Sequence, residues 1–403
     1  MIIFRADANT SIGMGHIMRC LSLAEAMAAD SSESMVINRG KKNIKFIIAD
    51  ESVSNLIQSC GYEPIILHTD YRAMDGEIDA WKELAPSIDV DLVIIDSYYV
   101  TSDYLNWLRH NIGMVCYIDD VLSFSYPVDI LINYNAYANI GDYHRLYKGC
   151  EEPKYLLGPT YAPLRAMFRD IDHREQRSVV TDVLLSTGGS DELHVAVSFL
   201  RYLCNEKDDK SEGITYHLLL GMMNTDKDEI KALAADDDRI KLHENVSDMR
   251  WLISSMDIVV SAAGSTLYEI CACGVPLITF STADNQIPGA EAFKRLGLAD
   301  NVGDLRDPES INSNLVMSGK LSADANKRIM SAVNNMARNK ESRTELGIRQ
   351  QALIDGYGAE RIAARLMEIV RENIRLFETS PFSATTVEDK LSSNHNIPDK
   401  GRK

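Results

Sequence analysis

A histidine follows two closely spaced glycines near the start of the chain. The segment "RADANTSIGMGHIMRC" places Gly13 and Gly15 just before His16, between an expected first strand and an expected first helix. It has neither the lysine of a P-loop nor the third glycine of a dinucleotide-binding fingerprint. The glycines would let a ligand approach the backbone, and a neutral imidazole at a helix N-terminus can accept a proton. His16 is therefore a candidate catalytic base. On position alone, a structural histidine bonded to a backbone carbonyl is the simpler interpretation.

Two glycine-containing turns in the second half of the chain have the composition of phosphate-binding loops. Each joins an expected strand to an expected helix, in "LLSTGGSDELHVA" and "VVSAAGSTLYEICACGVPLITF". Their backbone amides could bind a diphosphate, and a carboxylate beside the second turn could accept hydrogen bonds from ribose hydroxyls. The alternative is that Ser265 and Glu269 only cap a helix. The candidate binding residues here are Gly189, Ser190, Ser265, Thr266 and Glu269.

Other polar residues follow expected strands or lie between the halves. They are candidates for contacts with a bound sugar: Asp96, Tyr99, Asn133, Asn135, Arg165, Asn285 and Gln286. Turn formation explains Asp96 and Tyr99 equally well, and the alternative for Arg165 is an interdomain salt bridge. Asp119 and Asp120 in "YIDD" are the nearest approach to a metal site, but a capped strand end or a sugar contact is favoured there. We expect no metal and no other cofactor.

Short apolar runs alternate with helical patterns along most of the chain. Runs such as "MIIFRAD", "KFIIAD", "DLVIIDS" and "DILINYN" are typical of buried parallel strands, and the alternation resumes at "VVTDVLLSTGG". The pattern predicts an α/β protein with two Rossmann-like domains facing each other across a cleft. We assign residues 1–170 to the first domain, 171–377 to the second, and 378–403 to a polar, disordered tail.

The composition excludes several classes of partner. The chain has 403 residues and a formal net charge of −17, which disfavours nucleic acid and anionic membranes as partners. No secretory signal is evident, and no apolar run approaches the roughly 18 residues of a membrane span. Seven cysteines without a C-x-x-C pair fit reduced thiols. We expect a cytoplasmic monomer that acts on a small ligand.

The motifs together resemble a known family. "RADANTSIGMGHIMRCLSLAEAM", "VIIDSYYV", "YIDD", "LINYN", "YLLGPTYAPLR", "LLSTGGSD", "GSTLYE" and "DNQ" occur in the order found in the UDP-sugar hydrolases of pseudaminic acid biosynthesis, which are related to MurG-type glycosyltransferases. The resemblance implies a GT-B fold and hydrolysis of UDP-2,4-diacetamido-2,4,6-trideoxy-β-L-altropyranose by water attack at C1 with inversion. It also implies that His16 activates the water and that Arg165, Asn285 and Gln286 contact the substrate.

Two other functions share these features. A MurG-like glycosyltransferase would use the same UDP cleft, but its lipid-linked acceptor calls for an apolar or basic surface that the acidic first half lacks. A non-catalytic sugar-nucleotide-binding protein would not need a base at His16. Release of UDP without an added acceptor separates the hydrolase from both.

Removal of divalent metal tests the predicted mode of phosphate binding. Because backbone amides would stabilise the departing diphosphate, UDP release should persist in EDTA, with at most a modest effect of salt. Complete loss of activity that Mg²⁺ or Mn²⁺ restores would contradict this and would indicate Asp119 and Asp120 as ligands.

Overall fold

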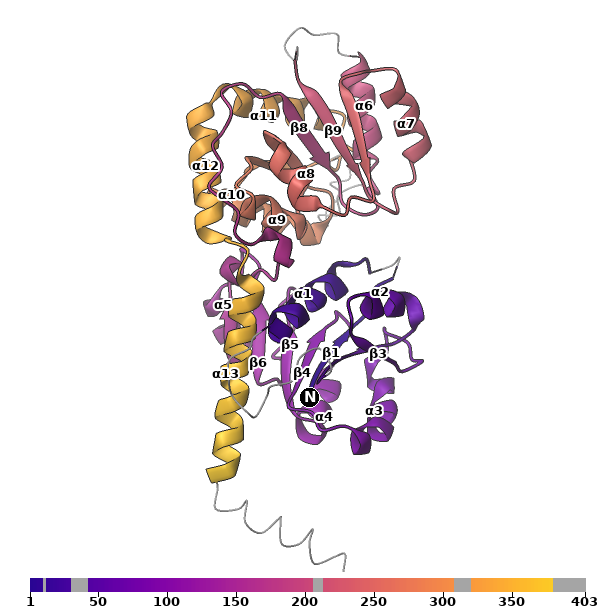
Figure 1. The fold of residues 1–403 in the computed structure, drawn as a ribbon, viewed down its shortest axis with the longest axis vertical. Coiled ribbons are helices and arrows are strands. Elements are labelled where there is room, and N and C mark those ends of the chain that lie inside the picture. The colour runs from indigo at the N-terminus through magenta and orange to yellow at the C-terminus, as the bar shows by residue number, and fades with distance from the viewer. Residues whose placement is uncertain (10–11, 30–42, 206–212, 308–319, 380–403) are drawn as a thin grey trace, which may run out of the picture.

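The chain folds into two parallel α/β halves, one above the other in Figure 1. The computed structural model describes residues 1–9, 12–29, 43–205, 213–307 and 320–379. The N-terminal sheet has seven strands in the order β3-β2-β1-β4-β5-β6-β7, and the C-terminal sheet has six in the order β10-β9-β8-β11-β12-β13. The predicted α/β class with two Rossmann-like halves is confirmed.

The elements of the N-terminal half alternate regularly between strand and helix. They are β1 (Ile2–Ala6), α1 (Gly15–Ala29), β2 (Ile44–Ile48), η2 (Glu51–Val53), α2 (Ser54–Ser59), β3 (Glu63–Ile66), η3 (Met74–Glu77), α3 (Ile78–Leu84), η4 (Ala85–Ser87), β4 (Leu92–Asp96), α4 (Ser102–Asn111), β5 (Met114–Ile118), β6 (Ile130–Asn133), α5 (Ile140–Leu146) and β7 (Lys154–Leu157). The 3-10 helices η5 (Pro159–Tyr161) and η6 (Ala166–Phe168) lie in the crossing to the second half.

The C-terminal half repeats this alternation. Its elements are β8 (Asp182–Ser186), α6 (Val195–Asn205), β9 (Thr215–Leu220), α7 (Lys227–Ala235), β10 (Ile240–Glu244), α8 (Met249–Ser255), β11 (Ile258–Ala262), α9 (Thr266–Ala272), β12 (Leu277–Ser281), η8 (Asp284–Gln286), α10 (Ile287–Arg295), β13 (Asp300–Asp304), α11 (Ala325–Arg338), α12 (Lys340–Leu353) and α13 (Gly358–Thr379).

Burial explains why the sequences of the central strands are continuous apolar runs. Every residue of β1, β4 and β11 is buried, as expected for parallel strands with helices on both faces. In each sheet the strand order reverses beside the first strand, so the loops after β1 and β4, and after β8 and β11, diverge at one edge. Ligands of doubly wound sheets bind at such carboxyl edges.

Two edge strands are missing from the sequence prediction. β7 is a short segment, "KYLL", immediately before the segment that crosses to the second half. β13 has the sequence "DNVGD", whose polar residues and glycine hide its pairing with β12. Both lie at an edge of their sheet, where burial does not require an apolar run.

The last helix returns to the N-terminal half. α13 packs on α1 and runs down beside the lower sheet in Figure 1, with Ile362 and Leu366 fully buried. The sequence prediction assigned residues 171–377 to one domain, whereas α13 contributes its buried side chains to the core around α1. The predicted tail begins at residue 378, but α13 extends to Thr379, and residues 380–403 lie outside the described chain. No helix among the described residues is both long and apolar enough to cross a bilayer.

The start of α13 depends on a close backbone approach at Gly358. A Cβ placed there would lie 2.1 Å from the carbonyl oxygen of Ala162, which is part of the crossing backbone. We therefore expect Gly358→Ala to destabilise the protein by about 1–3 kcal/mol, the usual cost of overpacking. Urea unfolding measures this. Gly76→Ala is the control, because its Cβ would meet no atom within 4 Å. Equal unfolding midpoints for the two variants would contradict the assignment.

Candidate active site

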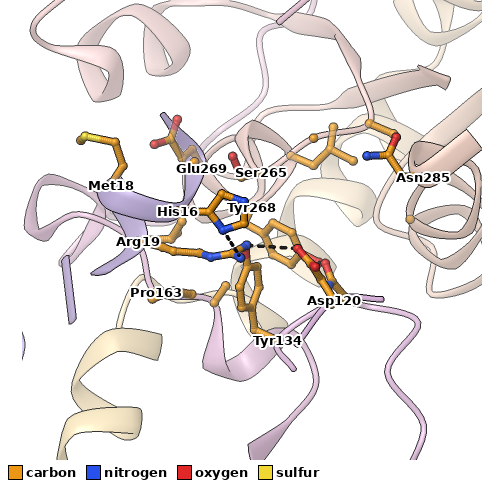
Figure 2. Close-up of a pocket in the computed structure, with 18 of the residues that line it drawn as sticks. His16, Met18, Arg19, Asp120, Tyr134, Pro163, Ser265, Tyr268, Glu269 and Asn285 are labelled. Atoms are coloured by element: carbon orange, nitrogen blue, oxygen red, sulfur yellow. Dashed lines mark hydrogen bonds and ion pairs between the residues drawn. The ribbon is translucent and has the colours of Figure 1, made fainter. Parts of the chain in front are cut away.

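A cavity of about 650 Å³ lies between the two halves, at the carboxyl ends of both sheets. Figure 2 shows side chains from both halves around it, including His16 and Asp120 from the N-terminal half and Ser265 and Asn285 from the C-terminal half. Loops after β1, β4, β5 and β6 form one wall, and loops after β11 and β12 form the other. The cleft expected from the sequence is therefore present.

His16 lies in the first turn of α1, and its ring contacts a buried carboxylate. Its Nδ1 lies 2.5 Å from Oδ1 of Asp96, at the end of β4. Asp96 is 1% exposed and does not line the cavity, whereas His16 does. The structure thus places Asp96 as the partner of His16, beneath the cavity wall, and not at the position expected for a sugar contact.

Arg19 balances the charge of that carboxylate. Its guanidinium donates to both oxygens of Asp96, from Nε to Oδ2 and from Nη2 to Oδ1. Burial alone would raise the pKa of Asp96, but Arg19 and then His16 hold it well below its usual value. Asp96 is therefore an ionised, accepting group. In the neutral imidazole, the contact with this accepting oxygen assigns the proton to Nδ1 and the lone pair to Nε2, although Arg19 Nη2 also lies 3.0 Å from Nδ1.

One of the two glycines before His16 has a backbone conformation that favours glycine. Gly13 has a φ of +74°, and its amide donates to the carbonyl of Asn9 at 2.8 Å. Only glycine adopts this backbone conformation without strain. Gly15 lines the cavity, and a Cβ there would meet no atom within 4 Å. Gly13 thus shapes the loop, and Gly15 leaves space at the mouth of the cavity.

Three side chains on the N-terminal wall were not predicted from the sequence: Arg19, Tyr98 and Tyr134. Arg19 also donates to the Tyr134 hydroxyl at 2.9 Å and reaches Asp120 Oδ2 at 3.4 Å. The Tyr98 hydroxyl donates to the same Asp120 oxygen at 3.0 Å, and the Tyr98 ring packs edge-on against His16 at 4.6 Å. The available signal was the spacing of His16 and Arg19, three residues apart on one helix face.

The C-terminal wall contains five predicted residues in contact with the cavity or with one another. Arg165 donates to Glu269 at 2.8 Å, so the residue expected to bind substrate or bridge the halves forms an ion pair at the cavity wall. Burial raises the pKa of Glu269, and Arg165 partly offsets this. Ser265 and Asn285 are exposed to the cavity, and Gln286 lines it while accepting from the Thr282 amide at 2.8 Å.

Of the two predicted asparagines at the end of β6, Asn135 lines the cavity and Asn133 does not. Asn133 is 2% exposed and donates to the Tyr143 hydroxyl at 2.8 Å. Tyr99 points elsewhere, and its ring packs against Tyr71 at 5.5 Å. Four further predicted residues, from the glycine-containing segments, do not line the cavity: Gly13, Thr266, Gly189 and Ser190.

The first glycine turn of the C-terminal half packs against a neighbouring strand. A Cβ on Gly221, directly after β9, would lie 2.3 Å from the carbonyl oxygen of Gly188 and 2.2 Å from that of Gly189. The turn follows β8, which pairs with β11, so it lies at the same sheet edge as Gly264. Both turns share that edge, but only the second reaches the cavity.

No group of three or more His, Cys, Asp or Glu side chains is placed to hold a metal ion in the described part of the chain. Asp119 accepts from the Val121 and Leu122 amides and from the Tyr126 and Tyr143 hydroxyls. It is completely buried, and its hydrogen bonds stabilise the loop after β5.

Sequence comparisons identify relatives with named activities. No known family model matches the chain. An uncharacterised protein of Methanocaldococcus jannaschii is 25% identical over 68% of this chain, and the match spans 54% of its own length. The UDP-2,4-diacetamido-2,4,6-trideoxy-beta-L-altropyranose hydrolase of Campylobacter jejuni is 24% identical over 65% of this chain and 85% of its own. A Helicobacter pylori protein named as a pseudaminic acid cytidylyltransferase and the same hydrolase is 26% identical, over 62% and 44%.

Solved structures show the fold. MurG of Acinetobacter baumannii superposes with a TM-score of 0.59 at 13% identity, covering 91% of this chain and 99% of its own. The UDP-GlcNAc 2-epimerase of Neisseria meningitidis, bound to UDP-GlcNAc, gives a TM-score of 0.59 at 10% identity, over 91% and 100%. The chain has the GT-B fold. Its sequence is similar to that of proteins named as UDP-sugar hydrolases.

The Asp96–Arg19 pair should behave as a coupled, buried unit. We expect Asp96→Asn and Arg19→Met each to lower the free energy of unfolding by about 3–5 kcal/mol, because each removes the main partner of a buried charge. The double variant should lose less than the sum of these two losses.

Urea unfolding measures this cycle, with Asp79→Asn as the control. Asp79 pairs with Lys82 on the surface, with side chains 88% and 57% exposed, and its loss should cost at most about 1 kcal/mol. Additive losses at Asp96 and Arg19 would show that the two charges are not coupled.

Proposed function

We propose that the protein hydrolyses UDP-2,4-diacetamido-2,4,6-trideoxy-β-L-altropyranose, or a closely similar UDP-sugar, to UDP and the free sugar. The observation that carries the proposal is the histidine held by a buried carboxylate at the wall of a cavity between two GT-B halves. The named activities of the Campylobacter and Helicobacter relatives support the substrate.

His16 would act as the base. With Nδ1 donating to Asp96, Nε2 is the ring nitrogen left to take a proton from water. The oxygen of that water attacks C1 as the bond from C1 to the diphosphate oxygen breaks, and UDP leaves with the bonding electrons. The proton stays on His16, whose charge Asp96 stabilises. A single displacement of this kind inverts the configuration at C1.

The C-terminal wall would hold the nucleotide. Ser265 and Thr266 begin α9, and their amides would stabilise the negative charge of the diphosphate, whereas the Gly264 amide already donates to the Ala262 carbonyl at 2.8 Å. Glu269 lies on the same helix and would accept from a ribose hydroxyl, while Asn285 and Gln286, which line the cavity, would face the sugar. We place Gly188–Ser190 as a second amide cradle at the same edge. We also propose a cytoplasmic monomer that needs no metal.

A MurG-like transfer of the sugar to an acceptor is the alternative function. Incubation of the purified protein with a panel of UDP-sugars and no acceptor tests the proposal. Steady release of UDP together with free sugar supports hydrolysis. Release of UDP only after a sugar acceptor is added would identify a transferase.

Replacement of His16 tests its role directly. We expect His16→Ala and His16→Asn to lower turnover by about two to four orders of magnitude, because the attacking water loses its base. Affinity for UDP should change little, since the nucleotide lies against the other half. Calorimetric titration with UDP is the control. Turnover close to that of the wild type would remove His16 from the mechanism.

Glu269 predicts a pH dependence of nucleotide binding. Burial raises its pKa, so the carboxylate takes up a proton at a higher pH than an ordinary glutamate as the solution is acidified. The protonated form accepts from ribose hydroxyls more weakly, so affinity for a UDP-sugar should fall as the pH is lowered toward that raised pKa. A UDP-sugar is the proper probe, because both of its phosphates are esterified. Glu269→Gln should bind with a flatter pH profile, and an unchanged profile would contradict the assignment.

A further inference from the structure

A ligand at the N-terminal wall of the cavity would meet mainly aromatic rings and methionine thioethers, and few free hydroxyls. Three tyrosines line it, and each hydroxyl already has a partner. The Tyr98 hydroxyl donates to the Asp120 side chain, Tyr137 donates to the Asp120 carbonyl at 2.8 Å, and Tyr134 accepts from Arg19. Tyr134 keeps its own hydroxyl proton, so the three tyrosines offer a sugar their aromatic faces and one phenolic donor.

Exposed apolar side chains continue this surface at the rim. Met14 is 44% exposed and Val121 is 49% exposed, and both line the cavity together with Ile12 and Met18. These four side chains offer no hydrogen bond to the hydroxyls of a hexose placed against them. A sugar with apolar substituents would bury methyl groups instead.

Asp120 retains one unused acceptor on this wall. Both hydrogen bonds to its carboxylate, from Tyr98 and Arg19, reach Oδ2, and within the described residues Oδ1 accepts none. Burial raises the pKa of Asp120 despite the opposing charge of Arg19. An N–H or O–H donor from a ligand would fill the free acceptor position at Oδ1. Val121, the next residue in the chain, also lines the cavity.

We propose that Asp120 and Val121 form an N-acyl subsite, in which Asp120 Oδ1 accepts from the amide N–H of an acylamino sugar and Val121 contacts its acyl methyl group. This inference rests on the proposed function and identifies which residues select its substrate. A donor directly attached to an apolar group matches the pair, whereas a hydroxyl would use Asp120 alone.

Two ligands that differ at one substituent test the subsite. UDP-N-acetylglucosamine and UDP-glucose differ only in an acetamido group against a hydroxyl at C2, and a His16→Asn background prevents hydrolysis during titration. We expect the first to bind about two- to ten-fold more tightly, because both ligands can donate to Asp120 and only the acetamido methyl group adds the contact with Val121. Val121→Ala should reduce this ratio to about 1, and Asp120→Ala should weaken the binding of both ligands.

Glu269→Ala is the matched control, because this carboxylate lies on the opposite wall. It should weaken both ligands alike and leave their ratio unchanged. Equal binding of the two ligands before mutation, a ratio that is unchanged in Val121→Ala, or unchanged binding of both ligands to Asp120→Ala would overturn the subsite, while UDP binding leaves the proposed function intact. Failure to bind UDP itself would contradict the proposed function as well.

Discussion

The candidate site depends on a single buried carboxylate at the end of a central strand. β4 pairs with β1 so that Asp96 lies opposite Ala6, where the chain leaves the sheet to begin α1. The first turns of that helix bring His16 and Arg19 onto the two oxygens of Asp96. An isolated carboxylate with 1% exposure would be very costly, so the guanidinium is a condition of the arrangement. The histidine gains a fixed orientation from it.

The cavity depends equally on contacts that hold the two halves together. The Tyr268 hydroxyl, on α9, accepts from the Ala136 amide at 3.0 Å, and its ring packs edge-on against Tyr134 at 5.5 Å. α13 then carries the end of the described chain back onto α1. The wall assigned to the sugar and the wall assigned to the nucleotide thus share one continuous apolar core. Their separation is set by packing as well as by the crossing segment.

The sequence was sufficient for the central strands and for the loops that follow them. Parallel buried strands require apolar runs, and their carboxyl ends meet at one edge, so His16, Ser265 and Asn285 could be placed at the cavity in advance. The partners of these residues could not. Asp96 and Arg19 are 77 positions apart, and only the register of β1 with β4 brings them together.

The same reasoning could not predict the edge strands or the side chains that share one hydrogen-bond partner. The polar sequence of β13 has no strand-like pattern, and its pairing follows from the position of β12. The hydroxyls of Tyr98 and Tyr137 converge on Asp120 from loops after different strands, which no local spacing reveals.

The central claim is that water activated by His16 attacks the anomeric carbon and not phosphorus. His16 lies in the half assigned to the sugar, whereas the nucleotide loops lie in the other. Hydrolysis in ¹⁸O-labelled water, followed at once by mass spectrometry of both products, tests this most directly. The account predicts the label in the free sugar and none in UDP. Label in the nucleotide product would contradict it.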